Sequence, residues 1–349
     1  MNKIKLPQTN EEYFLKAGKI IFDNNSSFEA LQNAVRAYHG ICCRITGICG
    51  AIEDKQQRYE TQLPTGFALS PGYAADCTLD TWRTVKYLRA LRAGVLAFRE
   101  KNPGRPVHVL YAGCGPFAPF AVLLSRVFKA EEVTFTLLDL HENALEAVKK
   151  IVKEFSLEDF FNAYIPCDAT EYTLQGERPQ ILVTETMHRT LSREPHVMIT
   201  RNLAPQLAAE GIVIPRKVAI RACLTDMEDE HRSYRNKLSI EENASRRIDL
   251  GVIFEVTKDT EYRFAGDENF FRGRSITIDE KIHEKDTIAL LTEITLFGDI
   301  TLKERESGIT FPHYALDLER LNPGDSIDFL FQAKGLPGIQ YKVCSELII

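Results

Sequence analysis

What this sequence lacks already limits its function. Its 349 residues hold no apolar run near the roughly 18 residues of a membrane-spanning helix, so we expect no membrane partner. The first residues, MNKIKLPQTNEEYF, lack the charged-then-apolar plan of a secretory signal, which makes a cytoplasmic location the expectation. Its 43 Lys and Arg are outnumbered by 49 Asp and Glu. Because a nucleic-acid backbone requires clustered basic side chains, nucleic acid is not the expected partner.

Ligand patterns for metals are also missing. The eight cysteines form no C-x-x-C pair, and the run from His39 to Cys49 lies in an apolar stretch with helical spacing. We therefore expect buried thiols there and no metal site.

The segment before residue 106 is mainly helical in pattern. Apolar residues recur at three- and four-residue spacings over Ser27 to Ile48 and over Thr78 to Arg99. Between them, LPTGFALSPGYAADC (63–77) is rich in proline and glycine, which predicts an ordered loop. Residues 1–105 are thus expected to form a helical N-terminal cap.

Two further segments complete the predicted α/β fold. Over 106–215, short apolar runs such as VHVLYAG, VTFTLLDL and ILVTET alternate with helical stretches, a pattern typical of a Rossmann-like, twisted, mainly parallel sheet. Residues 216–349 show strand-like alternation with turn residues at the breaks, which predicts a β-barrel-like C-terminal domain. The polar run 227–247 is expected to be a helical excursion or an exposed connection.

The clearest ligand signal is the turn after the first strand of this sheet. Tyr111 precedes Gly113 and Gly115, which let the backbone turn sharply and approach a ligand, with Pro116 expected in the first helical turn. A pyrophosphate loop would have a third glycine where Ala118 stands. The turn therefore favours a cofactor that offers an amino acid and a nucleoside.

Two later strand ends fit the nucleoside. Asp139, followed by Leu140, comes 24 residues after Gly115, where a carboxylate can accept hydrogen bonds from both ribose hydroxyls. Asp168 and Ala169 close the predicted third strand, where the adenine edge is expected.

After the fourth strand the chain carries two glutamates nine residues apart, Glu185 and Glu194. The following GIVIP and the upstream Leu79-Asp80-x-x-Arg83-Thr84 complete a pattern that resembles the protein arginine methyltransferase family. The resemblance implies S-adenosyl-L-methionine as methyl donor, with its carboxylate held by Arg83, and a homodimer.

The glutamate pair has a physical rationale of its own. Two carboxylates can hold a planar guanidinium through charge-assisted hydrogen bonds and fix one nitrogen against the methyl group. We assign Glu185 and Glu194 this clamp and His188 a proton relay. The alternative is that both acids cap helices or pair with Arg189 and Arg193 of the same loop.

The chain also departs from the family pattern. Thr186-Met187-His188 replaces Trp-Met-Gly after the first glutamate, and Pro312-His313-Tyr314 only echoes Thr-His-Trp. We therefore expect N-methylation of a small guanidine or amine, such as free arginine or a related metabolite. Alternatives are aminopropyl or aminocarboxypropyl transfer, methylation of protein arginine, and a cofactor-binding scaffold without turnover.

Overall fold

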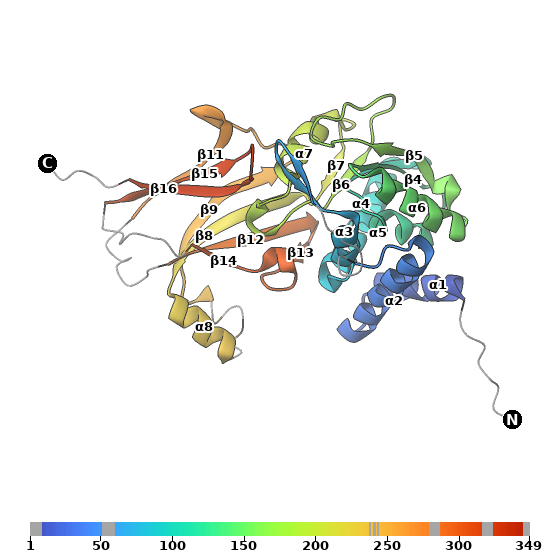
Figure 1. Ribbon diagram of the computed structural model, residues 1–349, viewed down its shortest axis with the longest axis horizontal. Coiled ribbons are helices and arrows are strands. Elements are labelled where there is room, and N and C mark those ends of the chain that lie inside the picture. The colour runs from blue at the N-terminus through green and yellow to red at the C-terminus, as the bar shows by residue number, and fades with distance from the viewer. Residues whose placement is uncertain are drawn as a thin grey trace.

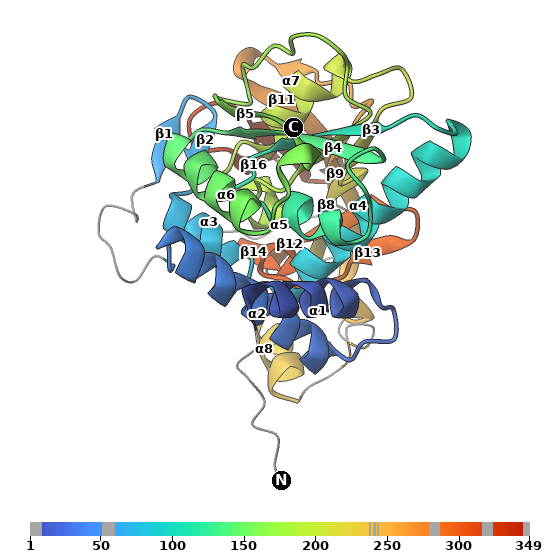
Figure 2. The ribbon, with the colours of Figure 1, turned by 90° about the vertical axis from the view of Figure 1, so that its right-hand side faces the viewer.

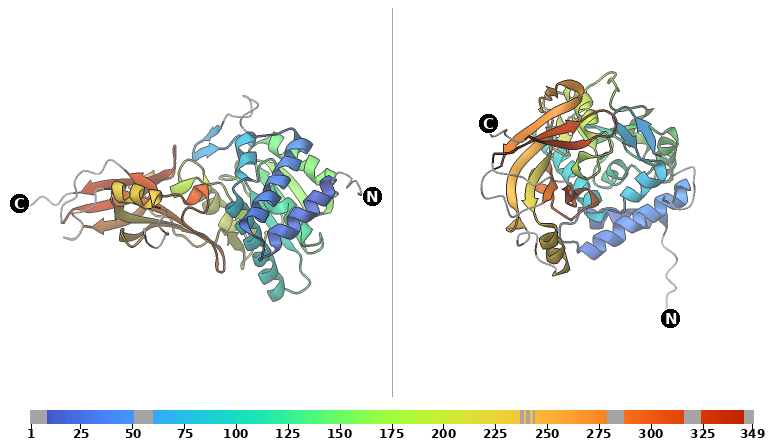
Figure 3. Two further views of the ribbon diagram at one scale, coloured as in Figure 1. Left: turned by 90° about the horizontal axis from the view of Figure 1, so that it is seen from below. Right: turned by 60° about the vertical axis from the view of Figure 1, so that its left-hand side comes forward.

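The computed structural model describes residues 9–50, 60–236, 239, 242, 244–278, 287–315 and 324–344. A part built on a parallel sheet and a part built from antiparallel strands lie side by side (Figure 1). The molecule is elongated, with the N-terminal helices, in blue, at the end opposite the antiparallel strands, in orange and red (Figure 3). The predicted fold class is confirmed.

The N-terminal part contains four helices and a hairpin. Their bounds are α1 (Asn10–Phe22), α2 (Phe28–Thr46), β1 (Thr61–Leu63), β2 (Gly66–Ala68), α3 (Pro71–Cys77) and α4 (Thr81–Lys101). Helix α2 begins at the N-cap Ser27 and ends at Gly47, whose φ of 77° is left-handed. The predicted loop over 63–77 is wrong in its second half, because Ser70 caps a short helix that has proline in its first turn.

Five parallel strands form the sheet that positions the site. They are β3 (Val107–Ala112), β4 (Val133–Asp139), β5 (Phe161–Pro166), β6 (Ile181–Thr184) and β7 (Ile212–Ile214), in the order β5-β4-β3-β6-β7. The helices between them are α5 (Pro119–Val122), α6 (Glu142–Glu154) and α7 (His196–Leu203), with one-turn helices at Leu124–Arg126, Glu158–Phe160, Arg189–Leu191 and Ala204–Gln206. Figure 2 shows α7 on one side of the sheet and α5 and α6 on the other.

Alternation along β3 explains the two covered faces. Val109 and Tyr111 pack toward the side of α4, α5 and α6, whereas Leu110 and Ala112 pack with Ile199 of α7. All of them are buried, so the strand reads as a nearly continuous apolar run.

The C-terminal part consists of two antiparallel sheets in a barrel-like arrangement. One sheet joins β8 (Lys217–Thr225), β9 (Ile248–Thr257), β12 (Thr287–Phe297), β13 (Ile300–Leu302) and β14 (His313–Ala315). The other joins β10 (Phe264–Ala265), β11 (Asp267–Thr277), β15 (Ser326–Gln332) and β16 (Gly338–Cys344). A one-turn helix lies at Gly308–Thr310. Helix α8 (Met227–Arg235) occupies the start of the predicted excursion 227–247, part of which lies outside the described residues.

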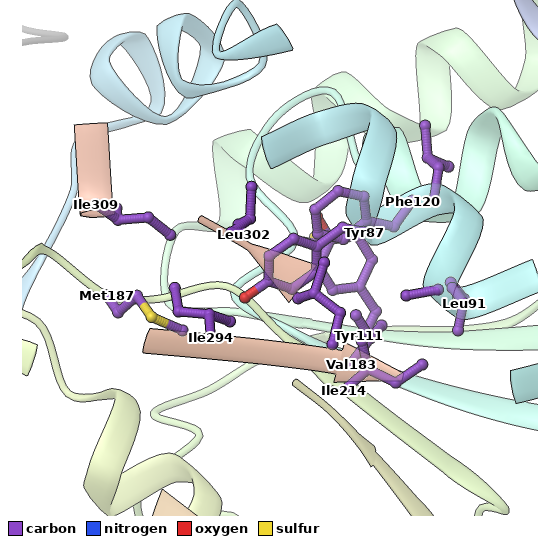
Figure 4. Close-up of a cluster of buried hydrophobic side chains, with 14 of the residues drawn as sticks. Tyr87, Leu91, Tyr111, Phe120, Val183, Met187, Ile214, Ile294, Leu302 and Ile309 are labelled. Atoms are coloured by element: carbon purple, nitrogen blue, oxygen red, sulfur yellow. The ribbon is translucent and has the colours of Figure 1, made fainter. Parts of the chain in front are cut away.

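One hydrophobic core runs from the helices into the antiparallel part. Figure 4 shows Tyr87 and Leu91 of α4 and Tyr111 of β3 in one cluster with Ile294 and Leu302 of the C-terminal sheet. Within the described residues, no helix has both the length and the apolar character needed to cross a bilayer.

Candidate active site

The carboxyl ends of β3, β4 and β6 meet at one edge of the sheet, and a cavity opens there. The space within it, including the part open to solvent, is about 960 Å³. The lining includes every residue that the sequence assigned to a cofactor, together with both predicted clamp glutamates: Arg83, Tyr111, Gly113, Gly115, Asp139, Leu140, Asp168, Ala169, Glu185 and Glu194. Arg83 and Glu194, which are 111 positions apart in the sequence, thus line one cavity.

The glycine turn after β3 adopts the backbone that its sequence predicts. Gly113 and Gly115 have left-handed φ angles of 68° and 63°. A Cβ added at Gly113 would lie 2.2 Å from the Cγ2 atom of Thr186, so only glycine allows the loop after β6 to come this close. The next helix begins at Pro119, which shows that the expectation of Pro116 in the first helical turn is wrong.

Asp139 joins the two loops at the cavity wall. One carboxylate oxygen, Oδ2, accepts a hydrogen bond of 2.8 Å from the Gly115 amide, and the other, Oδ1, accepts one of 2.9 Å from the His141 amide. Since a carboxylate oxygen has more than one lone pair, Asp139 retains acceptor capacity toward the cavity. Its position fits the predicted ribose contact.

The predicted adenine side lies after β5. Asp168 is oriented by Thr170, whose amide and hydroxyl both donate to Oδ1, at 2.8 and 2.7 Å. Ala169 is buried in the core behind it, and Cys167 and His141 complete this wall.

Arg83 lies at the opposite end, in the first turn of α4. Asp80, the N-cap, accepts a hydrogen bond from the Arg83 amide at 3.2 Å. The guanidinium donates to the Cys77 carbonyl at 2.9 Å and pairs with Oε2 of Glu185 at 3.1 Å. This side chain therefore links the N-terminal helices to the loop after β6 that carries Glu185 and Glu194, called the glutamate loop below.

The two glutamates occupy unlike environments. Burial raises the pKa of Glu185, and the charge of Arg83 opposes this shift. Its Oε1 atom is buried and has no hydrogen-bond partner among the described residues. Burial, reinforced by the charge of Glu185, raises the pKa of Glu194 to about 8. The ion pairs of Glu185 and Arg193 reach outside this loop, since Glu185 pairs with Arg83 and Arg193 pairs with Glu60.

His188 lies apart from this arrangement. It is not among the residues that line the cavity, and its Nδ1 lies 3.0 Å from the hydroxyl of Ser192. Burial and the charges of Arg189 and Arg193 lower the pKa of His188. A relay would therefore need a movement of the loop.

Several residues around the cavity were not anticipated from the sequence. Tyr87 stacks on Phe120 at 5.0 Å between ring centroids, and Phe120 stacks on Tyr111 at 5.2 Å. The Tyr87 hydroxyl is buried without a hydrogen-bond partner in the described part of the chain. Its place four residues after Arg83 on α4 was the available signal, because i and i+4 share a helix face. The hairpin residues Leu63, Phe67 and Ala68 also line the cavity.

Within the described ranges, no three His, Cys, Asp or Glu side chains are grouped so that they could hold a metal ion.

The sheet order and the cavity at its carboxyl edge define a Rossmann-like α/β fold joined to a barrel-like domain. No family model and no curated protein matches the sequence. Among solved structures, this chain is similar to the Trypanosoma brucei PRMT1 enzyme–prozyme heterotetrameric complex with AdoHcy, at 14% identity, with a TM-score of 0.49, over 78% of this chain and 98% of that one. It is also similar to Arabidopsis thaliana protein arginine methyltransferase 10, at 10% identity and a TM-score of 0.48, over 76% of this chain and 96% of that one. Both are protein arginine methyltransferases, the family that the sequence motifs resemble.

Proposed function

We infer that this chain is an S-adenosyl-L-methionine-dependent N-methyltransferase whose acceptor is a guanidine or amine nitrogen of a small molecule, such as free arginine. One observation carries the proposal: Glu185 and Glu194 line the same cavity as the Gly113 turn and Asp139.

The residues present fit the proposed donor. A donor built from an amino acid, a ribose and an adenine needs a cation, a hydrogen-bond acceptor and an apolar wall. Around one cavity, Arg83 provides the cation and Asp139 provides the acceptor. The two residues Leu140 and Ala169 provide the apolar wall. The guanidinium of Arg83 has five N–H donors, so its bonds to Cys77 and Glu185 leave others for a carboxylate. When bound, S-adenosyl-L-methionine supplies an electrophilic methyl carbon.

The glutamates would bind and orient the acceptor. Arg83 pairs with Oε2 of Glu185, and the unpartnered Oε1 is left to accept a hydrogen bond from a cationic nitrogen compound. Glu194 supplies the second carboxylate. A cation placed beside it lowers its pKa, so that binding releases its proton and leaves a carboxylate that can take a proton from the attacking nitrogen.

The proposal is tested by a radiolabelled-methyl screen that compares free arginine, related amines and arginine-rich peptides. Label in free arginine or an amine is expected, and Glu185→Gln should reduce turnover by roughly 10²-fold or more while donor affinity changes little. If the protein binds the donor but yields no S-adenosylhomocysteine with any acceptor, the scaffold alternative is correct. Product mass separates methyl from aminopropyl or aminocarboxypropyl transfer.

A cytoplasmic location and a homodimer belong to the same proposal. Sedimentation equilibrium of the full chain would test the dimer, because a mass near that of one 39.6 kDa chain at all concentrations would exclude it.

A further inference from the structure

A hairpin covers the cavity from the side of the glutamate loop. It consists of β1 and β2, which Figure 1 draws in blue between the two parts of the molecule. Leu63, Phe67 and Ala68 of this hairpin, with Leu69 after it, line the cavity. The hairpin therefore contributes an apolar wall to the cavity.

The tip of this hairpin is unusual because it is buried on one side, although Pro64 is exposed. Hairpin tips normally face solvent and tolerate change. Here Thr65 is only 8% exposed and Gly66 is buried. A Cβ added at Gly66 would lie 2.4 Å from the carbonyl oxygen of Arg193 and 3.0 Å from Pro337, so the tip is enclosed by the glutamate loop and the β15–β16 loop.

Backbone hydrogen bonds fasten the hairpin to both of these loops. The Phe67 amide donates to the Arg193 carbonyl at 2.7 Å, and the Gly335 amide donates to the Pro64 carbonyl at 2.7 Å. The Arg193 amide in turn donates to the Pro337 carbonyl at 3.1 Å. Three segments that are far apart in the sequence are thus joined around one side of the cavity.

Two side-chain contacts also hold the hairpin in place. The guanidinium of Arg193 pairs with Glu60 at 2.8 Å and lies over the Phe67 ring at 5.9 Å. At the same end of the hairpin, the Thr61 hydroxyl lies 3.0 Å from Nε2 of His141, in the loop that follows Asp139. The cover is therefore held at the predicted acceptor side and at the predicted ribose side.

We propose that the β1–β2 hairpin, called the roof below, determines the acceptor specificity of this site. Because its contacts hold it in place over the cavity, it admits a small free guanidine or amine and excludes an arginine within a polypeptide. An arginine in a polypeptide brings two flanking chain segments to the entrance, and the loops that would have to receive them are already bonded to the hairpin. This inference rests on the proposed function, and it names the feature that sets the acceptor class.

The test uses the full chain and a double variant, Glu60→Gln/Thr61→Val, which removes both side-chain contacts and leaves every cavity-lining residue in place. Gln62→Ala is the matched control, because Gln62 lies on the same hairpin and is exposed. Methyl transfer to free arginine and to a Gly-Arg-Gly-rich peptide is measured for each protein, together with hydrogen exchange of the hairpin amides.

Wild type and Gln62→Ala should methylate free arginine at least tenfold faster than the peptide, and the double variant should lower this preference by about tenfold. Exchange of the Phe67 and Gly335 amides should be slow in the first two proteins and faster in the double variant. Equal rates on peptide and free arginine in wild type would overturn the proposal, as would an unchanged preference in a variant whose hairpin exchanges freely.

A failure of the proposed function is distinguishable from a failure of the roof. If wild type methylates no acceptor, the proposed function fails, and the roof is judged by exchange alone. Rapid exchange at Phe67 and Gly335 in wild type then refutes the roof, whereas slow exchange that the double variant loses supports it.

Discussion

Glu194 is the residue whose environment has the clearest chemical consequence. Its carboxyl lines the cavity beside a second acid, and its pKa is raised to about 8 by burial and by the charge of Glu185. A carboxyl with a pKa near the working pH can accept a proton from a nitrogen and still be largely available as a base. Folding has thus placed an acid where its charged form is unfavourable until a cation arrives.

This environment predicts a pH dependence for the enzyme. If the charged form of Glu194 binds the acceptor, kcat/KM should rise about tenfold per pH unit below pH 8 and level off above it. Glu194→Gln should abolish this limb of the profile as well as most of the activity. A flat wild-type profile between pH 6 and pH 8 would contradict the assignment.

The raised pKa of Glu194 also makes the stability of the fold depend on pH, but stability should fall with rising pH whereas activity should rise. Because the pKa of Glu194 is higher in the folded chain than its ordinary value, its protonated form stabilises the fold at low pH, and this contribution is lost as pH rises toward 8. Glu194→Gln should therefore be more stable than wild type at pH 8, by roughly 1–3 kcal/mol, and similar to it near pH 4. Denaturant unfolding at both pH values measures the difference, and a less stable variant at pH 8 would refute the argument.

The Arg83–Glu185 pair serves both the fold and the proposed donor site. Both side chains are about 10% exposed, so the loss of one leaves an uncompensated buried charge. Arg83→Met alone should cost about 3–5 kcal/mol, and Arg83→Met/Glu185→Gln should recover part of it.

Donor binding separates the two roles of Arg83. Calorimetry with S-adenosylhomocysteine should show weakened binding in both Arg83 variants, including the double variant with recovered stability. Affinity equal to that of wild type would refute the assignment of Arg83 to the donor carboxylate.

At the scale of elements, helix α8 depends on one buried carboxylate. Glu230 accepts hydrogen bonds from Arg247 at 2.7 and 3.0 Å, from Tyr314 at 2.8 Å and from Thr225 at 2.9 Å. Arg247 also binds Glu304. The network fixes the helix to three separate segments of the C-terminal part.

Glu230→Gln should therefore lower the free energy of unfolding by about 2–4 kcal/mol, because it removes the charge that faces Arg247. Arg232→Ala on the same helix breaks surface pairs with Glu228 and Asp229 and should change the free energy of unfolding by less than about 0.5 kcal/mol. Chemical denaturation compares the two variants. Equal effects would show that the buried network does not stabilise α8.

Some helices and strands could be predicted from the sequence and others could not. The strands β3, β4 and β6 are predictable because strands buried on both faces are nearly continuous in apolar residues. The β1–β2 hairpin and α3 are not, because their proline and glycine content is typical of loops. The conformation of the hairpin depends on contacts with Arg193, Gly335 and Pro337, which are distant in sequence.

Only some features of the site could be predicted from the sequence. Asp139 could be placed from motif spacing, because parallel strands bring their carboxyl ends to one edge of the sheet. Arg83 and the two glutamates were assigned from the family resemblance. The pairing of Arg83 with Glu185, the aromatic stack on Tyr87 and the covering hairpin could not be predicted, since each depends on packing between distant segments. Position in a motif loop likewise did not place His188 at the cavity.

Contacts between the two parts of the molecule predict that they unfold together. Helix α4 packs against β12 and β13, and Asp80 at its N-cap accepts hydrogen bonds from the Ser307 hydroxyl at 2.6 Å and the Gly308 amide at 3.0 Å. Trp82, the only tryptophan, lies in the first turn of α4, so its fluorescence reports on the N-terminal part. A continuous core makes separate unfolding of either part costly, because it would expose apolar surface on both.

The guanidinium unfolding curve from Trp82 fluorescence should therefore coincide with the curve from hydrogen exchange of β8 and β12. Asp80→Ala should shift both curves together by roughly 1–3 kcal/mol, because it removes a helix cap and both bonds to the C-terminal part. Ser307→Ala, which removes only one of those bonds, should shift them by about 1 kcal/mol or less. Separate transitions in wild type would show that the two parts fold independently and that the shared core does not couple them.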